Sequence, residues 1–168
     1  LMRTGLAFGT LLPATLKAIS DGVTSNSWGE GVNSLMSTVG DLVCGVAGIK
    51  LVVKGEEHLW KKRPAVFVLN HQSNVDMFIA AKLVRQNATG IAKKELQLYP
   101  IIGQLMQGAG VIFIDRKNKV KAIEAMKPAV DALKSGTSVI IFPEGTRSKS
   151  YKLGKFKIIL LLFMNSSY

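Results

Sequence analysis

The chain has 168 residues, enough for one globular domain with its own core and too few for two domains of ordinary size. It is 48% hydrophobic and carries a formal net charge of +11, a combination that suits an anionic lipid surface or a phosphorylated ligand. The basic residues are not interleaved with aromatic ones as nucleic-acid stacking surfaces need, so we predict no nucleic-acid partner. A single cysteine excludes an intrachain disulfide, and neither histidine lies near it, so we predict no metal site.

Residues 1–47 form an apolar and amphipathic segment for which we predict helices. Arg3, Pro13 and Lys17 interrupt its apolar start, which is too short and too broken to indicate a transmembrane helix. Residues 28–46 place apolar side chains at helical spacing. Helices with such a face either lie in a membrane interface or pack on the core of the domain, and the sequence leaves both open.

Residues 48–157 alternate between predicted strands and predicted helices, which is typical of an α/β domain. Alternating or short apolar runs predict strands at 49–53, 65–69, 90–92, 111–114 and 139–142. Apolar residues three and four positions apart predict helices at 75–85, 99–107 and 120–133. Pro128 should kink the last of these helices. We therefore predict a mixed sheet flanked by helices.

Three of the predicted strands run directly into polar residues. In open α/β sheets, ligands bind just outside the carboxyl ends of the strands. Packing alone does not explain three polar clusters in equivalent positions, so we expect them to form a site. The clusters are residues 70–76, 115–116 and 143–148.

His71 and Asp76 are the candidate catalytic pair in the first cluster. Histidine is the natural general base near neutral pH, and it needs a partner that fixes its tautomer and stabilises the imidazolium. The two residues can meet if His71 ends the strand in a turn and Asp76 enters the following helix. No serine, threonine or cysteine is obviously placed as a nucleophile, so the pattern favours activation of a substrate hydroxyl. On spacing alone, a turn histidine and a helix aspartate without a joint role remain the alternative.

The clusters resemble the motifs of the 1-acylglycerol-3-phosphate acyltransferases, also called lysophosphatidic acid acyltransferases. Residues 70–76 are similar to the family's His-x-x-x-x-Asp signature, residues 110–116 to its second motif and residues 142–148 to its third. The motifs occur in order and at matching separations. The resemblance implies a glycerolipid acyltransferase fold. It also implies transfer of an acyl group from acyl-CoA or acyl carrier protein to the sn-2 hydroxyl of lysophosphatidic acid, giving phosphatidic acid.

The resemblance further implies a role for each motif residue. By that analogy His71 takes the proton from the hydroxyl and Asp76 orients His71. Arginine suits a phosphate because its planar fork makes paired, charge-assisted hydrogen bonds. We expect Arg116 and Arg147 to follow neighbouring strands and to face one anion. The residues that would help bind the phosphorylated acceptor are Arg116, Glu144, Gly145, Thr146 and Arg147.

The motifs leave the acceptor open, because acceptor choice depends on the shape of the pocket. Glycerol 3-phosphate or another lysophospholipid is the alternative within the family, and a non-catalytic membrane-binding remnant is the alternative outside it. We expect no cofactor and no obligate protein partner. The apolar N-terminal segment and a basic run predict a location at the cytoplasmic face of a membrane, either peripheral or anchored through the N-terminal segment. The run comprises Arg147, Lys149, Lys152, Lys155 and Lys157.

The sequence departs from the family's pattern after Lys157. Residues 158–168 form an atypical apolar tail where the family has small residues including glycine, and the apolar-proline segment of the family's fourth motif is absent. We therefore expect the catalytic domain at 48–157 to be incomplete, with residues 139–142 beside an exposed sheet edge. We also expect residues 1–168 alone to be poorly soluble and to show acyl transfer near background.

Overall fold

The structure is a computed structural model that divides into two compact units. The first unit comprises residues 1–62 and 74–87, and the second comprises residues 63–73 and 88–168. Apart from Pro13 and Lys17, the apolar start at 1–19 and the apolar tail at 158–168 lie outside the described residues. The described residues are 28–84, 87–100, 102–115, 124–148, 150 and 152–157, with isolated positions at 13, 17 and 20.

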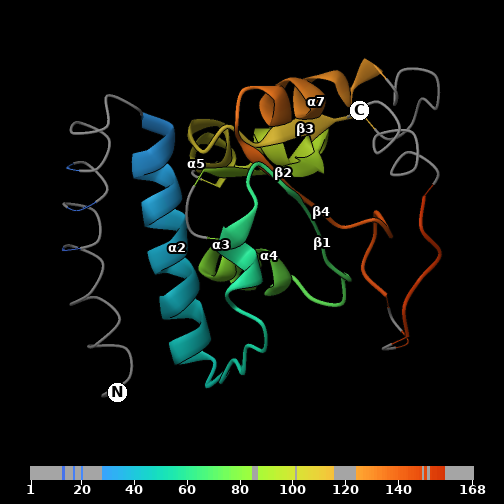
Figure 1. Cartoon of the computed structure of the whole chain (residues 1–168). Helices are drawn as coiled ribbons and strands as arrows, with labels where there is room; N and C mark the ends of the chain where they lie inside the picture. Colours follow the sequence, from blue (N-terminus) through green and yellow to red (C-terminus); the bar gives the residue numbers. More distant parts are fainter. Residues whose placement is uncertain are drawn as a thin grey trace. The chain divides into compact units, whose positions relative to one another are not determined.

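The first unit is built on two helices, α2 (Trp28–Val46) and α4 (Asp76–Leu83), which pack against each other (Figure 1). A Cβ atom on Gly40 of α2 would lie 2.5 Å from the carbonyl oxygen of Phe78 in α4. The missing side chain therefore lets the two backbones approach closely. Both helices confirm elements that the apolar spacing of the sequence predicts.

The predicted strand at 49–53 is wrong. Among the described residues this segment pairs with no strand, and it leads into the short helix α3 (His58–Lys61). Val52 is 79% exposed and Val53 is 41% exposed, so the alternate positions of Ile49, Leu51 and Val53 do not mark a buried face here. No helix among the described residues combines the length and the apolar composition needed to cross a bilayer.

The second unit contains a sheet with the strand order β1-β4-β2-β3 (Figure 1). All of the described pairings are parallel, where the sequence predicts a sheet of mixed direction. Parallel neighbours need crossover connections, and the predicted helices between the strands supply the residues for them. The α/β class is confirmed. The strands are β1 (Val66–Val68), β2 (Ala88–Lys93), β3 (Ile112–Ile114) and β4 (Ser138–Ile141).

The second unit also contains the helices η1 (Lys94–Leu98), α5 (Ile102–Gly108) and α7 (Lys127–Lys134). Pro128 lies in the first turn of α7, where its missing N–H leaves no intrahelical bond unmade. It therefore begins the helix and does not kink it. Residues 120–123 of the predicted helix lie outside the described part of the chain.

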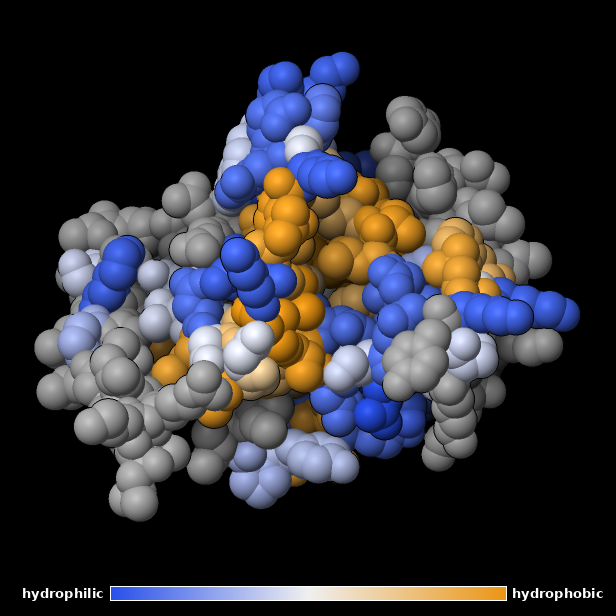
Figure 2. Space-filling view, turned by 90° about the horizontal axis from the view of Figure 1, so that it is seen from below, coloured by the Kyte–Doolittle hydropathy of each residue, from blue (hydrophilic) through white to orange (hydrophobic). Residues whose placement is uncertain are grey.

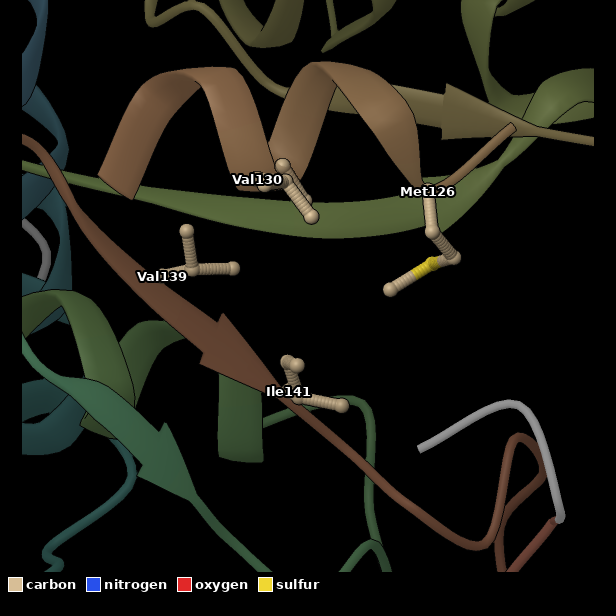
Figure 3. Packing of buried hydrophobic residues seen from close by; sticks show 5 residues of the cluster. Met126, Val130, Val139 and Ile141 are labelled. Carbon is tan, nitrogen blue, oxygen red and sulfur yellow. The ribbon is translucent and has the colours of Figure 1, made fainter. Parts of the chain in front are cut away.

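The core of the second unit lies between α7 and the sheet (Figure 3). Val130 of α7 and Met126 just before it pack with Val139 and Ile141 of β4. Fully burying a side chain of this size stabilises the fold by about 1.5–3 kcal/mol. Apolar residues from the other three strands pack against the same cluster, so α7 fixes the sheet as a whole. These are Val66, Ile91 and Ile112.

β4 lies inside the sheet, between β1 and β2. The prediction that residues 139–142 lie beside an exposed edge is therefore wrong. All four β4 residues are buried, as a central strand requires. Even its polar residue is satisfied, because the Ser138 hydroxyl accepts a hydrogen bond from the Ala65 N–H at 3.2 Å. The order of the strands places the ends of β1 and β4 side by side.

Candidate functional site

The segments that follow β1 and β4 meet at the carboxyl edge of the sheet, where ligands bind in parallel α/β folds. His71 follows β1, and Phe142 follows β4 directly. The two rings are in contact, with centroids 4.5 Å apart and an interplanar angle of 32°. The structure thus brings the first and third polar clusters together.

His71 is held by its main chain as well as by its ring. Its N–H donates a hydrogen bond to Oε1 of Glu144 at 2.9 Å. Its carbonyl oxygen accepts a hydrogen bond from the N–H of Ser148 at 2.8 Å. The third cluster therefore fixes the backbone of His71 on both sides while the imidazole stays only half-buried. A base with a fixed backbone and an accessible ring suits proton transfer to or from a substrate.

The Glu144 carboxylate lies inside the domain, with the residue only 3% exposed. One oxygen accepts the His71 N–H, and the other accepts the N–H of Gly154 at 2.9 Å. A buried charge is tolerated when it is hydrogen-bonded in this way. The sequence places Glu144 among the acceptor-binding residues, but the structure directs its carboxylate to the backbone.

The turn after Glu144 presents the next residues outward. Gly145 has φ +64°, a left-handed conformation that glycine adopts without strain, and its N–H donates to the carbonyl oxygen of Phe142 at 3.0 Å. Thr146 and Arg147 follow on the turn and are exposed. The same turn therefore buries a carboxylate and offers a guanidinium to solvent.

Lys157 lies over this turn. Its N–H donates to the carbonyl oxygen of Pro143 at 2.9 Å. A Cβ on Gly145 would lie 3.0 Å from the Cδ and Cε atoms of Lys157 and 3.4 Å from its Nζ. The ammonium group of Lys157 and the guanidinium of Arg147 thus give the turn a local positive charge, which suits an anionic ligand.

Asp76 is the first residue of α4 and belongs to the first unit, whereas His71 belongs to the second. Pairing between their side chains stays a prediction. The carboxylate lies in the first turn of its helix, where the helix dipole favours a negative charge.

Arg116 lies outside the described residues. The expectation that Arg116 and Arg147 follow neighbouring strands is wrong, because β2 separates β3 from β4. Strands lie about 4.8 Å apart, so the ends of β3 and β4 are about 10 Å apart. The exposed Lys93, the last residue of β2, lies between them at the same edge of the sheet.

Sequence reasoning missed the residues that hold the site together. These are Phe142, Ser148, Gly154 and Lys157. Only Phe142 carried a usable signal, as the apolar residue at the end of a buried strand. Ser148 and Gly154 act through their backbone N–H groups, and side-chain periodicity carries no information about that.

Comparisons with known proteins identify relatives over most of the described part. A family model described as "Acyltransferase" matches residues 50–159. The 1-acyl-sn-glycerol-3-phosphate acyltransferase of Limnanthes douglasii is 42% identical over 120 residues, which cover 71% of this chain and 42% of that protein. The protein of the same name from Saccharomyces cerevisiae is 36% identical over 107 residues, which cover 63% of this chain and 35% of that protein.

The fold also matches a solved structure. The crystal structure of the 1-acyl-sn-glycerophosphate (LPA) acyltransferase PlsC from Thermotoga maritima superimposes with a TM-score of 0.70 at 29% sequence identity. The match covers 83% of this chain and 55% of the Thermotoga chain. The chain spans less than half the length of the two relatives above.

Proposed function

Because the chain belongs to the acyltransferase family, we propose that it transfers a fatty acyl group from a thioester donor to the free sn-2 hydroxyl of lysophosphatidic acid. The product is phosphatidic acid. The observation that carries the proposal is the turn after β4. Its residues hold the backbone of His71 through hydrogen bonds, and its Arg147 is exposed. A base whose backbone is hydrogen-bonded to a turn that carries an exposed cation suits an acceptor with both a hydroxyl and a phosphate.

In the proposed reaction His71 acts as a general base. Its imidazole takes the proton of the acceptor hydroxyl while the oxygen attacks the thioester carbonyl. The tetrahedral intermediate then collapses, the carbon–sulfur bond breaks, and the imidazolium returns its proton to the leaving thiolate. Asp76, carried over from the family's first motif, orients His71 and stabilises the imidazolium. The donor thioester is that of CoA or of acyl carrier protein.

The exposed residues of the turn bind the phosphate in this proposal. Arg147 offers a planar fork that matches two phosphate oxygens, and Lys157 adds a point charge over the same turn. Thr146 offers a hydroxyl next to Arg147, and Gly145 gives the turn its shape. Arg116 supplies a further cation, as the resemblance of the second motif implies.

The test of the proposed function compares acceptors. With oleoyl-CoA as the donor, we expect a full-length version of the protein to acylate lysophosphatidic acid with a higher kcat/KM than glycerol 3-phosphate or lysophosphatidylcholine. The reason is that Arg147 and Lys157 bind an exposed phosphate monoester through charge-assisted hydrogen bonds, whereas a choline head group covers the phosphate and offsets its charge. A preference for either competitor moves the assignment to that acceptor. Absence of acyl transfer to all three contradicts the proposal.

We also propose that the protein works at an anionic membrane surface on the cytoplasmic face. Apolar side chains lie exposed among hydrophilic ones on the surface (Figure 2). In the segment after the turn, Leu153 is 65% exposed and Phe156 is 50% exposed. The exposed Lys152, Lys155 and Lys157 alternate with them. Apolar side chains next to lysines suit the interface of an anionic bilayer.

Liposome sedimentation measures this association. We expect binding to vesicles that contain phosphatidic acid or phosphatidylserine and a loss of binding as the salt concentration rises, because each basic residue near the surface contributes about 1 kcal/mol. Replacing Lys152 and Lys155 with glutamine should weaken the binding, and Lys134→Gln, on α7, serves as the control. Equal binding to neutral vesicles at high salt means that apolar insertion dominates instead.

A further inference from the structure

We propose that Glu144 is a positioning residue, whose buried carboxylate locks the His71 loop and the Gly154 segment into one arrangement and so sets the position of the base. Its catalytic meaning rests on the proposed function, in which His71 is the base. Glu144, His71 and Gly154 all belong to the second unit. It differs from the role in acceptor binding that the sequence suggests for Glu144.

The two oxygens of the carboxylate serve two separate segments of the chain. Oε1 accepts the N–H of His71, which lies 73 positions earlier in the sequence, and Oε2 accepts the N–H of Gly154, ten positions later, both at 2.9 Å. Hydrogen bonds to an ionised acceptor are about twice as strong as neutral ones. At 3% exposure, water has little access to compete for these oxygens. One side chain therefore joins the loop after β1 to the segment that follows the turn.

The chemistry of the site argues against Glu144 as a ligand of the acceptor. A carboxylate repels a phosphate, and both of its oxygens already accept main-chain hydrogen bonds. Arg147, three positions later, is exposed and has the opposite charge. The left-handed Gly145 between them turns the chain, so the inward residue supports the base and the outward residue contacts the ligand.

Gly154 lies directly against the Glu144 carboxylate. A Cβ atom at this position would lie 2.5 Å from Oε2 of Glu144 and 3.3 Å from its Cδ. Gly154 is not in the left-handed region, so alanine fits its backbone, and the three atoms nearest to its Cβ would all belong to the Glu144 side chain. The substitution Gly154→Ala thus disturbs Glu144 without touching its charge.

His71 has further contacts that keep the loop folded without the carboxylate. Its carbonyl oxygen accepts the Ser148 N–H, and its ring packs on Phe142. Loss of the Glu144 contact should therefore misplace the imidazole and leave the domain intact. A misplacement of about 1 Å at a reacting group lowers the rate by up to about a hundredfold.

The experiment combines amide hydrogen exchange with kinetics on the Glu144→Gln variant. Glutamine keeps the shape of the side chain but replaces one acceptor oxygen with a donor, so one of the two main-chain bonds is lost. We expect exchange at the His71 or Gly154 amide to accelerate about ten- to hundredfold. We expect kcat to fall by up to about a hundredfold while the KM for lysophosphatidic acid is unchanged. Glu124→Gln, at an exposed position before α7, is the matched control and should change neither readout.

Gly154→Ala provides an independent arm. It should reproduce the faster exchange at His71 and the lower kcat, and the double variant should be no worse than the more severe single one, because both act on the same contact. Gly90→Ala is the matched glycine control, since a Cβ on that β2 residue meets nothing within 4 Å. This arm carries the test if Glu144→Gln does not fold.

Two results would overturn the inference. One is an unchanged exchange rate at the His71 and Gly154 amides in both variants. The other is a higher KM for lysophosphatidic acid with an unchanged kcat, which would assign Glu144 to acceptor binding. If the protein acylates no lysophosphatidic acid at all, the proposed function fails, and the exchange rates still decide whether Glu144 holds the two segments together.

Discussion

Acyl transfer by the His71→Ala variant is expected to fall by about 10²–10⁴-fold, the usual contribution of a general base. Alanine has no nitrogen to accept the proton of the acceptor hydroxyl. The fold should survive, because the His71 N–H that donates to Glu144 and the His71 carbonyl oxygen that accepts from Ser148 are main-chain groups that alanine also has. Initial rates with oleoyl-CoA and lysophosphatidic acid measure the loss, and thermal unfolding measures the fold.

The other histidine gives a matched control. The His58 side chain is 74% exposed, and its Nε2 lies 3.4 Å from the Glu57 carboxylate, outside the three motifs. His58→Ala should therefore keep the rate of the unsubstituted protein. Asp76→Asn should lose less than His71→Ala, since His71 keeps a hydrogen-bond partner and loses only the charge that stabilises the imidazolium. Substantial turnover by His71→Ala would contradict the proposed mechanism.

Four of the five strands predicted from the sequence are confirmed, and the one at 49–53 is wrong. Residues 65–69 and 111–114 contain β1 and β3, residues 90–92 lie within β2, and residues 139–142 overlap all of β4 except Ser138. A short apolar run bounded by turn residues is typical of a buried strand. Residues 49–53 place Ile49, Leu51 and Val53 at alternate positions, yet the segment pairs with no described strand. Alternation reports which side chains prefer burial. It does not report whether a hydrogen-bonding partner is within reach.

The order of the strands could not be read from local sequence, and this caused two errors. β4 comes last of the described strands in the chain and was expected beside an open edge, but the crossovers place it between β1 and β2. β3 and β4 are consecutive in sequence and were expected to be neighbours, but β2 lies between them. Connections through helices let a late strand enter the middle of a sheet, where apolar residues of the other three strands pack against the cluster that α7 and β4 form.

The sequence predicts a chemistry for the site and says little about how the site is built. Histidine and arginine at strand ends indicate a base and a phosphate ligand because few other residue types do those tasks. The sequence does not show which polar residue turns inward. Glu144 and Arg147 stand in the same short motif, and only the fold separates a carboxylate with 3% exposure from an exposed guanidinium.

The Arg147→Ala variant is expected to raise the KM for lysophosphatidic acid about ten- to hundredfold, because a hydrogen bond to a charged group contributes about 1.5–3 kcal/mol. The KM for acyl-CoA should change little, since the proposal assigns Arg147 to the phosphate of the acceptor. The fold should be unaffected, because Arg147 is exposed on its turn. Varying each substrate at a saturating concentration of the other separates the two KM values.

Two substitutions test whether the effect belongs to the guanidinium and its position. Arg147→Lys keeps the charge and loses the planar fork, so its KM should lie between those of the unsubstituted protein and Arg147→Ala. Lys134→Ala removes an exposed charge at the end of α7 and should leave both KM values unchanged. Salt should raise the acceptor KM of the unsubstituted protein more than that of Arg147→Ala, since screening acts on the interaction that the variant lacks. If Arg147→Ala changes only the KM for acyl-CoA, the turn after β4 binds the donor, and the phosphate of the acceptor must be held elsewhere.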